Sequence, residues 1–354
     1  ETLVSEGDDR TLQSSIGEWD INWLTDGEEI APGDYELLIE FSGRYSTDSL
    51  GMHRVTFEGN DYIATQMEAM YARRAFPIFD EPSFKIPYQL TIVAPADLVV
   101  VANEPEASST VEDGWQRTEF MPTPPLPSYL IAYAVGPLER TPIEGLDVPG
   151  FVYVPKGHTD KVGYVTRETP AIFNALEAYF DLKYPFRKLD FIAVPEFAFG
   201  AMENPGLITF RTDLLLVGDE PAGQQAQTVL MVIAHEIAHI WYGDLVTMAW
   251  WDDLWLNEAF ASWMAWTILE NIYPQFESSL YLAQESAFPG DQRTTSEAIR
   301  RTIREDKDAL ASAGLNYTCL LYTSDAADDR YKVFLWVGWV CLGLGGGGGG
   351  GGGG

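Results

Sequence analysis

Two of the four histidines in this 354-residue sequence lie four positions apart, within the segment VIAHEIAHIWYGD at residues 232–244. Residues i and i+4 share one face of an α-helix, so His235 and His239 can present two imidazoles to one metal ion. Glu258, in the segment WLNEAF, offers a third ligand if a second helix brings it back toward the first. Two histidines in an ordinary buried helix are the alternative. The glutamate at this spacing favours one hydrolytic Zn²⁺ site per chain.

The carboxylate after the first histidine completes this chemistry. In such a site zinc lowers the pKa of its bound water toward neutrality and polarises the carbonyl of the bond to be cut. Glu236 is placed to take the proton of the attacking water and to pass it to the leaving amine, as a general base. The oxyanion that forms needs a second donor besides the metal, commonly a phenol or an imidazole.

Helices are expected to position these residues. Segment 224–243 has helical length and apolar periodicity and is expected to stop at a glycine, and 257–273 reads as a second helix. Another amphipathic helix is expected at 169–184, with a proline near its first turn, and a buried strand at 188–197. The histidines therefore belong to an α+β module.

The preceding part of the chain is expected to be all-β. Alternating, β-branched or aromatic runs are bounded by Pro, Gly and Asn, as in a β-sandwich. These runs cover residues 34–45, 88–95, 98–105 and 128–136. The expected domains are 1–148, an N-terminal β-sandwich domain whose start is missing, and 149–318, the catalytic domain.

Charge and hydropathy argue against some classes of binding partner. The chain carries 22 basic and 53 acidic residues, a formal net charge of −31. Such a charge repels nucleic acid and anionic membrane surfaces, so no nucleic-acid partner is expected. No apolar run is long enough to predict a membrane span. The compartment, cytoplasmic or periplasmic or secreted, stays open.

Residues 319–354 are interpreted as a non-biological tail. Their first part, CLLYTSDAADD, corresponds to the translation of a sequencing adapter, and a run of ten glycines at the end corresponds to poly-G base calls. Both cysteines, Cys319 and Cys341, fall in this tail. No disulfide framework is therefore expected in residues 1–318.

A further motif, GAMEN at residues 200–204, joins HEIAH and WLNEAF, and together they resemble the aminopeptidase N family of zinc metallopeptidases. The resemblance covers about residues 30–318, including TQMEAMYARRAFPIFDEPSFK at 65–85. It implies a multidomain protein, β then α+β. An N-terminal β-sandwich precedes a thermolysin-like zinc-peptidase domain that is incomplete at its C-terminus, and a C-terminal helical domain of the same chain is missing.

The resemblance also assigns residues to roles. It makes His235, His239 and Glu258 the zinc ligands and Glu236 the general base. Glu203 corresponds to the carboxylate that binds the free α-amine of a peptide, and Gln66 and Glu68 to residues that reach the same amine. The remaining implied residues are Gly200 and Ala201, whose backbone pairs with substrate like an added strand, Met202 and Asn204, which complete the substrate-binding motif, and Tyr317, the oxyanion donor.

The expected activity is that of a zinc-dependent aminopeptidase, which releases the N-terminal residue from peptides. An internal peptide segment has no ammonium group, so carboxylates beside the zinc would stay unpaired when it binds. An endopeptidase is the alternative that GAMEN opposes. An epoxide hydrolase, like the leukotriene hydrolases of the same family, shares every zinc motif and stays open. A non-catalytic scaffold is disfavoured because all ligands and Glu236 are present.

Overall fold

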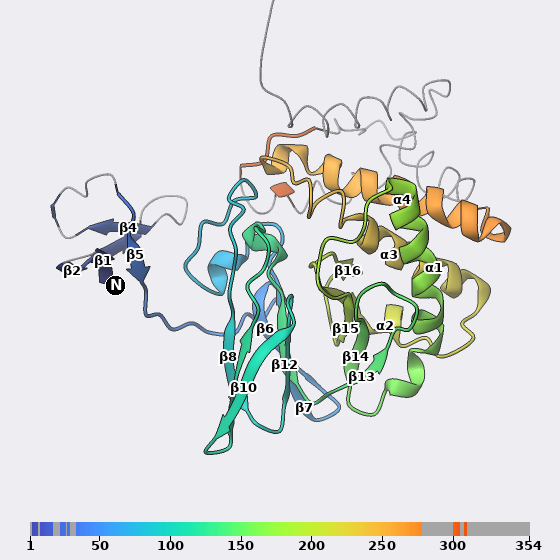
Figure 1. Cartoon of the computed structure of the whole chain (residues 1–354), viewed down its shortest axis with the longest axis horizontal. Coiled ribbons are helices and arrows are strands. Elements are labelled where there is room, and N and C mark those ends of the chain that lie inside the picture. The colour runs from blue at the N-terminus through green and yellow to red at the C-terminus, as the bar shows by residue number, and fades with distance from the viewer. Residues whose placement is uncertain are drawn as a thin grey trace, which may run out of the picture.

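The computed structural model describes residues 2–5, 8–16, 22–25, 27–28, 33–277, 300–304 and 308–309. Tyr317 and the interpreted tail, 319–354, lie outside the described residues. Along the described chain, strands come first and helices follow, as Figure 1 shows from blue to orange. This order confirms the predicted β then α+β fold class.

Short strands form the N-terminal end of the molecule (Figure 1). A three-stranded sheet has the order β2-β1-β5, and β3 pairs with β4. The strands are β1 (Thr2–Ser5), β2 (Asp8–Thr11), β3 (Gln13–Ile16), β4 (Asn22–Thr25) and β5 (Glu36–Leu38). The long strand predicted over 34–45 is wrong beyond β5. Apolar residues such as Leu37 and Phe41 are 42% and 58% exposed, so their alternation does not mark a buried face.

Two antiparallel sheets make up the rest of the β-rich region. One has four strands in the order β6-β7-β12-β9, and the other has three in the order β10-β11-β8. The strands are β6 (Gly51–Phe57), β7 (Asn60–Gln66), β8 (Thr91–Pro95), β9 (Val99–Ala102), β10 (Glu106–Glu112), β11 (Trp115–Phe120) and β12 (Tyr133–Gly136). Short 3-10 turns occur at Ala72–Arg74 and Ser128–Leu130.

A five-stranded mixed sheet follows, in the order β13-β14-β15-β17-β16. Its central pairs, β14 with β15 and β15 with β17, are parallel, and both edges are antiparallel. The strands are β13 (Leu138–Pro142), β14 (Phe151–Pro155), β15 (Asp190–Val194), β16 (Ala201–Met202) and β17 (Leu207–Arg211). A domain boundary at residue 148 stays a proposal, and β13 joins this sheet from before that residue.

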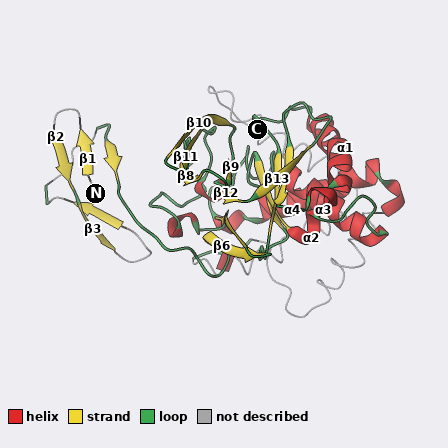
Figure 2. Ribbon diagram, turned by 90° about the horizontal axis from the view of Figure 1, so that it is seen from below, coloured by secondary structure: helices red, strands yellow, loops and turns green. Residues whose placement is uncertain are grey.

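Helices cover this sheet on the side opposite the β-rich region (Figures 1 and 2). They are α1 (Gly163–Phe180), α2 (Thr212–Leu215), α3 (Gly223–Ala238) and α4 (Trp255–Ile272), with 3-10 turns at Thr159–Lys161, Trp251–Asp253 and Pro274–Phe276. α1 begins before the predicted 169–184, so Pro170 lies in the helix interior and not in its first turn. Among the helices that the structure describes, none has the length and apolar content needed to cross a bilayer.

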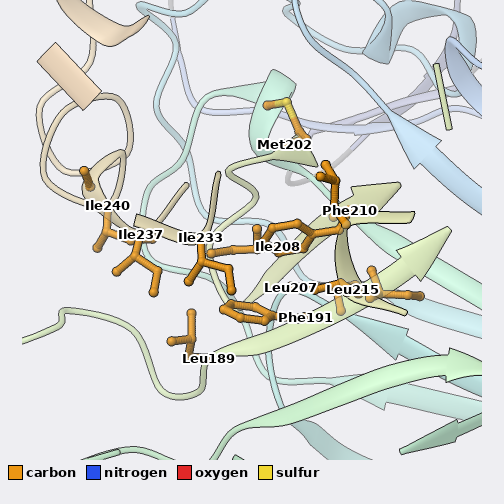
Figure 3. Packing of buried hydrophobic residues seen from close by; sticks show 14 of the residues in the cluster. Leu189, Phe191, Met202, Leu207, Ile208, Phe210, Leu215, Ile233, Ile237 and Ile240 are labelled. Carbon is orange, nitrogen blue, oxygen red and sulfur yellow. The ribbon is translucent and has the colours of Figure 1, made fainter. Parts of the chain in front are cut away.

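The apolar face of α3 anchors the helix on the sheet. Buried residues recur at helical spacing from Ala226 through Leu230 and Ile233 to Ile237. Figure 3 shows Ile233 and Ile237 beside the strand residues Phe191 and Ile208. This packing fixes the position of α3 on the sheet. It therefore also fixes the side chains on the opposite face of the last helical turn.

Candidate active site

Two helix ends bring the predicted catalytic residues together. His235 and Glu236 lie in the last turn of α3, and His239 is the C-cap residue. The chain then turns at Gly243, where φ is +134°, a conformation that favours glycine. It returns through α4, whose first turn carries Glu258. The predicted helix over 224–243 is thus wrong in its last residues, since α3 ends at Ala238.

The three predicted ligand atoms converge. His235 Nε2 and His239 Nε2 are 2.9 Å apart. Glu258 Oε2 lies 3.3 Å from His235 Nε2 and 3.7 Å from His239 Nε2. Ligand atoms about 2.0–2.1 Å from a tetrahedral zinc ion lie about 3.4 Å from one another. Two imidazoles and one carboxylate at these separations fit zinc.

The outer nitrogens of both imidazoles are engaged, which leaves the inner ones for a metal. His239 Nδ1 faces two oxygen acceptors, the carbonyl of Tyr242 at 3.0 Å and Asn257 Oδ1 at 2.8 Å. It must therefore be the N–H, and Nε2 keeps its lone pair. His235 Nδ1 lies 3.3 Å from Ser262 Oγ. Burial lowers the pKa of His235 to about 4, so the neutral, ligating form is favoured.

Glu236 is buried beside these ligands. Its Oε2 has no hydrogen-bond partner among the described residues. Burial, and then the negative charges of Glu203 and Glu258, raise the pKa of Glu236 well above its usual range. A buried carboxylate oxygen without a partner is a proton acceptor available to a reacting group.

The GAMEN segment forms one edge of the five-stranded sheet. β16, which is Ala201–Met202, pairs with β17 on one side only and is the last strand in the sheet order. The Gly200 carbonyl accepts a hydrogen bond from Arg211 N. A Cβ at Gly200 would meet only Leu214 Cδ1, at 3.7 Å, so the backbone there is accessible. The other edge of β16 can add a strand.

The remaining residues of the motif lie in different surroundings. Glu203 is buried, and its Oε1 accepts a hydrogen bond from Asn257 Nδ2 at 2.9 Å. Glu203, Glu236 and His239 each place one candidate ligand atom within 4.8 Å of the others. Met202 is buried in the core. Asn204 accepts from Leu207 N through its carbonyl. The structure thus brings Glu203 to the metal ligands, whereas Asn204 bonds to Leu207 and Thr209.

Gln66 and Glu68 come from the β-rich region. Gln66 ends β7, and its Nε2 lies 3.3 Å from Met202 Sδ. Its Oε1 is buried and has no hydrogen-bond partner in the part of the chain that the structure describes. Burial, and then the negative charges of Glu203 and Glu258, raise the pKa of Glu68 well above its usual range. Both residues therefore adjoin the site that the helices form.

Four further residues hold the site, and sequence reasoning missed their roles. Lys85 donates to the carbonyls of Asp244 and Leu245, at 2.8 and 3.2 Å. Asn103 donates to the carbonyl of Pro205, and Tyr129 to that of Gly243. Asn257 joins His239 to Glu203. Only Asn257 carries a sequence signal, its position directly before Glu258, because the other contacts cross between distant segments.

The site holds several acids and few cations. Among the described residues, neither Lys nor Arg forms an ion pair with Glu68, Glu203 or Glu236. Buried carboxylates need compensating charge. The arrangement can therefore accept two external cations, a metal ion and an ammonium group. Tyr317, the expected oxyanion donor, lies outside the described residues.

Two family profiles and several relatives match this chain. The profile of the peptidase family M1 domain matches residues 164–313, and that of the peptidase M1 N-terminal domain matches residues 18–130. A glutamyl aminopeptidase of Bos taurus is 41% identical over 246 residues, which are 66% of this chain and 26% of the relative. Aminopeptidase 2 of Candida albicans is 39% identical over 249 residues, 68% of this chain and 27% of the relative.

Another relative matches a longer stretch. Probable aminopeptidase 1 of Sulfurisphaera tokodaii is 36% identical over 276 residues, 76% of this chain and 35% of the relative. The chain thus spans about a quarter to a third of the length of these relatives. With both domain profiles matched in chain order and the motifs of the aminopeptidase N family in place, the chain belongs to peptidase family M1.

Proposed function

We propose that the protein is a zinc-dependent aminopeptidase that releases the N-terminal residue from peptides. The observation that carries the proposal is the juxtaposition of a zinc-type donor set with buried acids that have no lysine or arginine partner among the described residues. The names of the relatives, which are aminopeptidases, support the same activity.

His235, His239 and Glu258 would hold one zinc ion per chain. Zinc bound there supplies a Lewis acid, which polarises a carbonyl oxygen and acidifies water. Glu236 takes up the proton released during attack on the carbonyl carbon, at the Oε2 atom that has no partner among the described residues, and returns it to the leaving amine. Because the same carboxylate takes up the proton and returns it, the proton stays inside the site.

Glu203 and Glu68 would bind the free α-amine of the peptide, and Gln66 Oε1 supplies a further acceptor. An ammonium group there neutralises carboxylates that are otherwise buried close to one another, as the effect of Glu203 on the pKa of Glu68 indicates. The edge of β16 aligns the peptide backbone from Gly200 and Ala201. A substrate without the ammonium group leaves this charge uncompensated.

Paired fluorogenic substrates test the proposal. An aminoacyl substrate with a free amine is expected to be cleaved, and its N-acetylated counterpart to be cleaved at least about 100-fold more slowly, because charged hydrogen bonds are lost. Glu203→Ala is expected to reduce this discrimination mainly through KM. Equal cleavage of both substrates by the parent protein would contradict amine recognition and indicate an endopeptidase. Hydrolysis of an epoxide lipid without peptide cleavage would indicate the alternative activity.

A further inference from the structure

The side-chain amide of Asn257 lies between the metal ligands and the amine-binding acid. Asn257 is the third residue of α4 and is 1% exposed. Its Nδ2 donates to Glu203 Oε1 at 2.9 Å, and its Oδ1 accepts from His239 Nδ1 at 2.8 Å. One planar group thus contacts both functional parts of the site.

The chemistry of its neighbours fixes the orientation of this amide. The Nδ2 amide group donates to the Glu203 carboxylate oxygen, so the NH₂ end of Asn257 faces Glu203. The oxygen then faces His239, whose Nδ1 has the Tyr242 carbonyl as its other acceptor. Rotating the amide by half a turn would set two acceptors against each other at Glu203 and two donors at His239. Only the observed orientation satisfies both ends.

The backbone leaves room for this amide at Gly243. A Cβ on Gly243 would lie 2.1 Å from Asn257 Oδ1, well inside contact distance, and the φ of +134° there is itself unfavourable for other residues. The turn that follows His239 is therefore shaped around the side chain of Asn257. The absence of a side chain at Gly243 therefore leaves the space that the amide occupies.

We propose that Asn257 is a positioning residue that couples the metal ligand His239 to Glu203, and so fixes the amine-binding carboxylate relative to the metal. This inference rests on the proposed function and deepens it. The amide holds His239 in the tautomer whose Nε2 can ligate a metal, and it holds Glu203 in the rotamer that receives the ammonium group. A fixed offset between the two restricts cleavage to the first peptide bond.

A double-mutant cycle tests the hydrogen bond to His239 and the hydrogen bond to Glu203 separately. Asn257→Leu is expected to weaken Zn²⁺ binding by about 10- to 100-fold in competition with a chromophoric chelator, as for loss of an outer-shell partner of a ligand. It is also expected to raise KM for the free-amine substrate by about 10-fold or more, the effect of losing a hydrogen bond to a charged group. In a Glu203→Ala background the zinc effect should persist and the KM effect should disappear.

Ser262, which lies beside the ligand His235, offers a matched control. Ser262→Ala removes a hydroxyl that lies 3.3 Å from His235 Nδ1 and forms no hydrogen bond with Glu203 among the described residues. It is expected to weaken zinc binding without changing the ratio of kcat/KM values for the free and acetylated substrates. Asn257→Asp keeps the acceptor oxygen for His239, and its zinc affinity is expected to stay within about threefold of that of the parent, so it serves if the leucine variant does not fold.

Several outcomes would overturn the inference. One is an equal KM increase for Asn257→Leu in both backgrounds, which indicates a merely structural role. Another is equal loss of zinc affinity in Asn257→Leu and Asn257→Asp. If the parent protein cleaves the acetylated substrate as fast as the free one, the proposed function fails instead, and the zinc titrations still decide whether Asn257 orients His239.

Discussion

Two buried clusters of ionisable side chains lie in the α+β half of the molecule, and they differ in their partners. Lys188 and Asp190 form an ion pair at 2.7 Å, with side chains 10% and 3% exposed. The Lys188 ammonium also donates to the Gly206 carbonyl, and Asp190 accepts from Phe151 N. By contrast, Glu203 and Glu236 have neither a Lys nor an Arg ion-pair partner among the described residues.

The two clusters differ in whether a basic side chain compensates the buried carboxylate. Burial lowers the pKa of Lys188 and raises that of Asp190, and the charge of each opposes the shift of the other, so the pair is satisfied within the chain. Burial and like charges raise the pKa of Glu236, with no basic residue to oppose them. Buried carboxyl groups without a basic partner within the described chain can instead be paired by a metal ion or a substrate ammonium group.

The largest expected effect comes from removing a metal ligand. Glu258→Ala deletes one of three donor atoms that lie 2.9–3.7 Å apart. Zinc content after dialysis should fall below stoichiometry and peptide hydrolysis should fall to background, a greater loss than the about 10- to 100-fold attributed to outer-shell partners. Elemental analysis and the fluorogenic assay measure the two quantities. If the variant keeps stoichiometric zinc and full turnover, Glu258 is not a required metal ligand and the contrast between the two clusters fails.

A smaller effect is expected from the general base. Glu236→Gln keeps the size of the side chain but removes the proton acceptor, so kcat should fall by about 10²- to 10⁴-fold. Zinc content should stay stoichiometric, because Glu236 is not one of the ligands. Steady-state kinetics beside elemental analysis checks both. A variant that loses its zinc would show that Glu236 acts in holding the metal and not in moving a proton.

The smallest effect on activity is expected at the neutralised pair. Asp190→Ala leaves the Lys188 ammonium buried alone and should lower the free energy of unfolding by about 3–5 kcal/mol. The kcat/KM value per folded molecule should stay unchanged. The matched control, Lys188→Met with Asp190→Leu, removes both charges and should restore most of the stability. Chemical denaturation measures the stabilities, and a loss of turnover in the folded variant would place this pair in the functional site.

The sequence predicts the parts of this site that depend on local spacing. His235, Glu236 and His239 are close because a helix makes them so, and the β then α+β order follows from the patterns of apolar residues. The end of α3 is less accessible to such reasoning. Buried Ile240 and Trp241 continue the apolar pattern after the helix has ended, because the turn itself is packed into the core.

Long-range contacts could not be predicted from the sequence. Asn257 and Glu203 are 54 positions apart, and Lys85 lies 159 positions before Asp244. Nothing in the spacing of these residues indicates that they meet, because their approach is set by how α4 packs on α3 and how the β-rich region contacts the turn between the two helices. The motifs therefore indicate which residues matter, and the fold determines which of them act together.

The hydrogen bonds from Lys85 to the carbonyls of Asp244 and Leu245 have a consequence for exchanging parts of this protein with those of relatives. The lysine belongs to the β-rich half and the carbonyls to the helical half, so the position of this turn depends in part on a side chain from the other half. A chimaera that exchanges either half with that of a distant relative pairs a side chain with a turn that did not evolve beside it. Such a chimaera is therefore expected to need matched changes on both sides of this junction to remain stable.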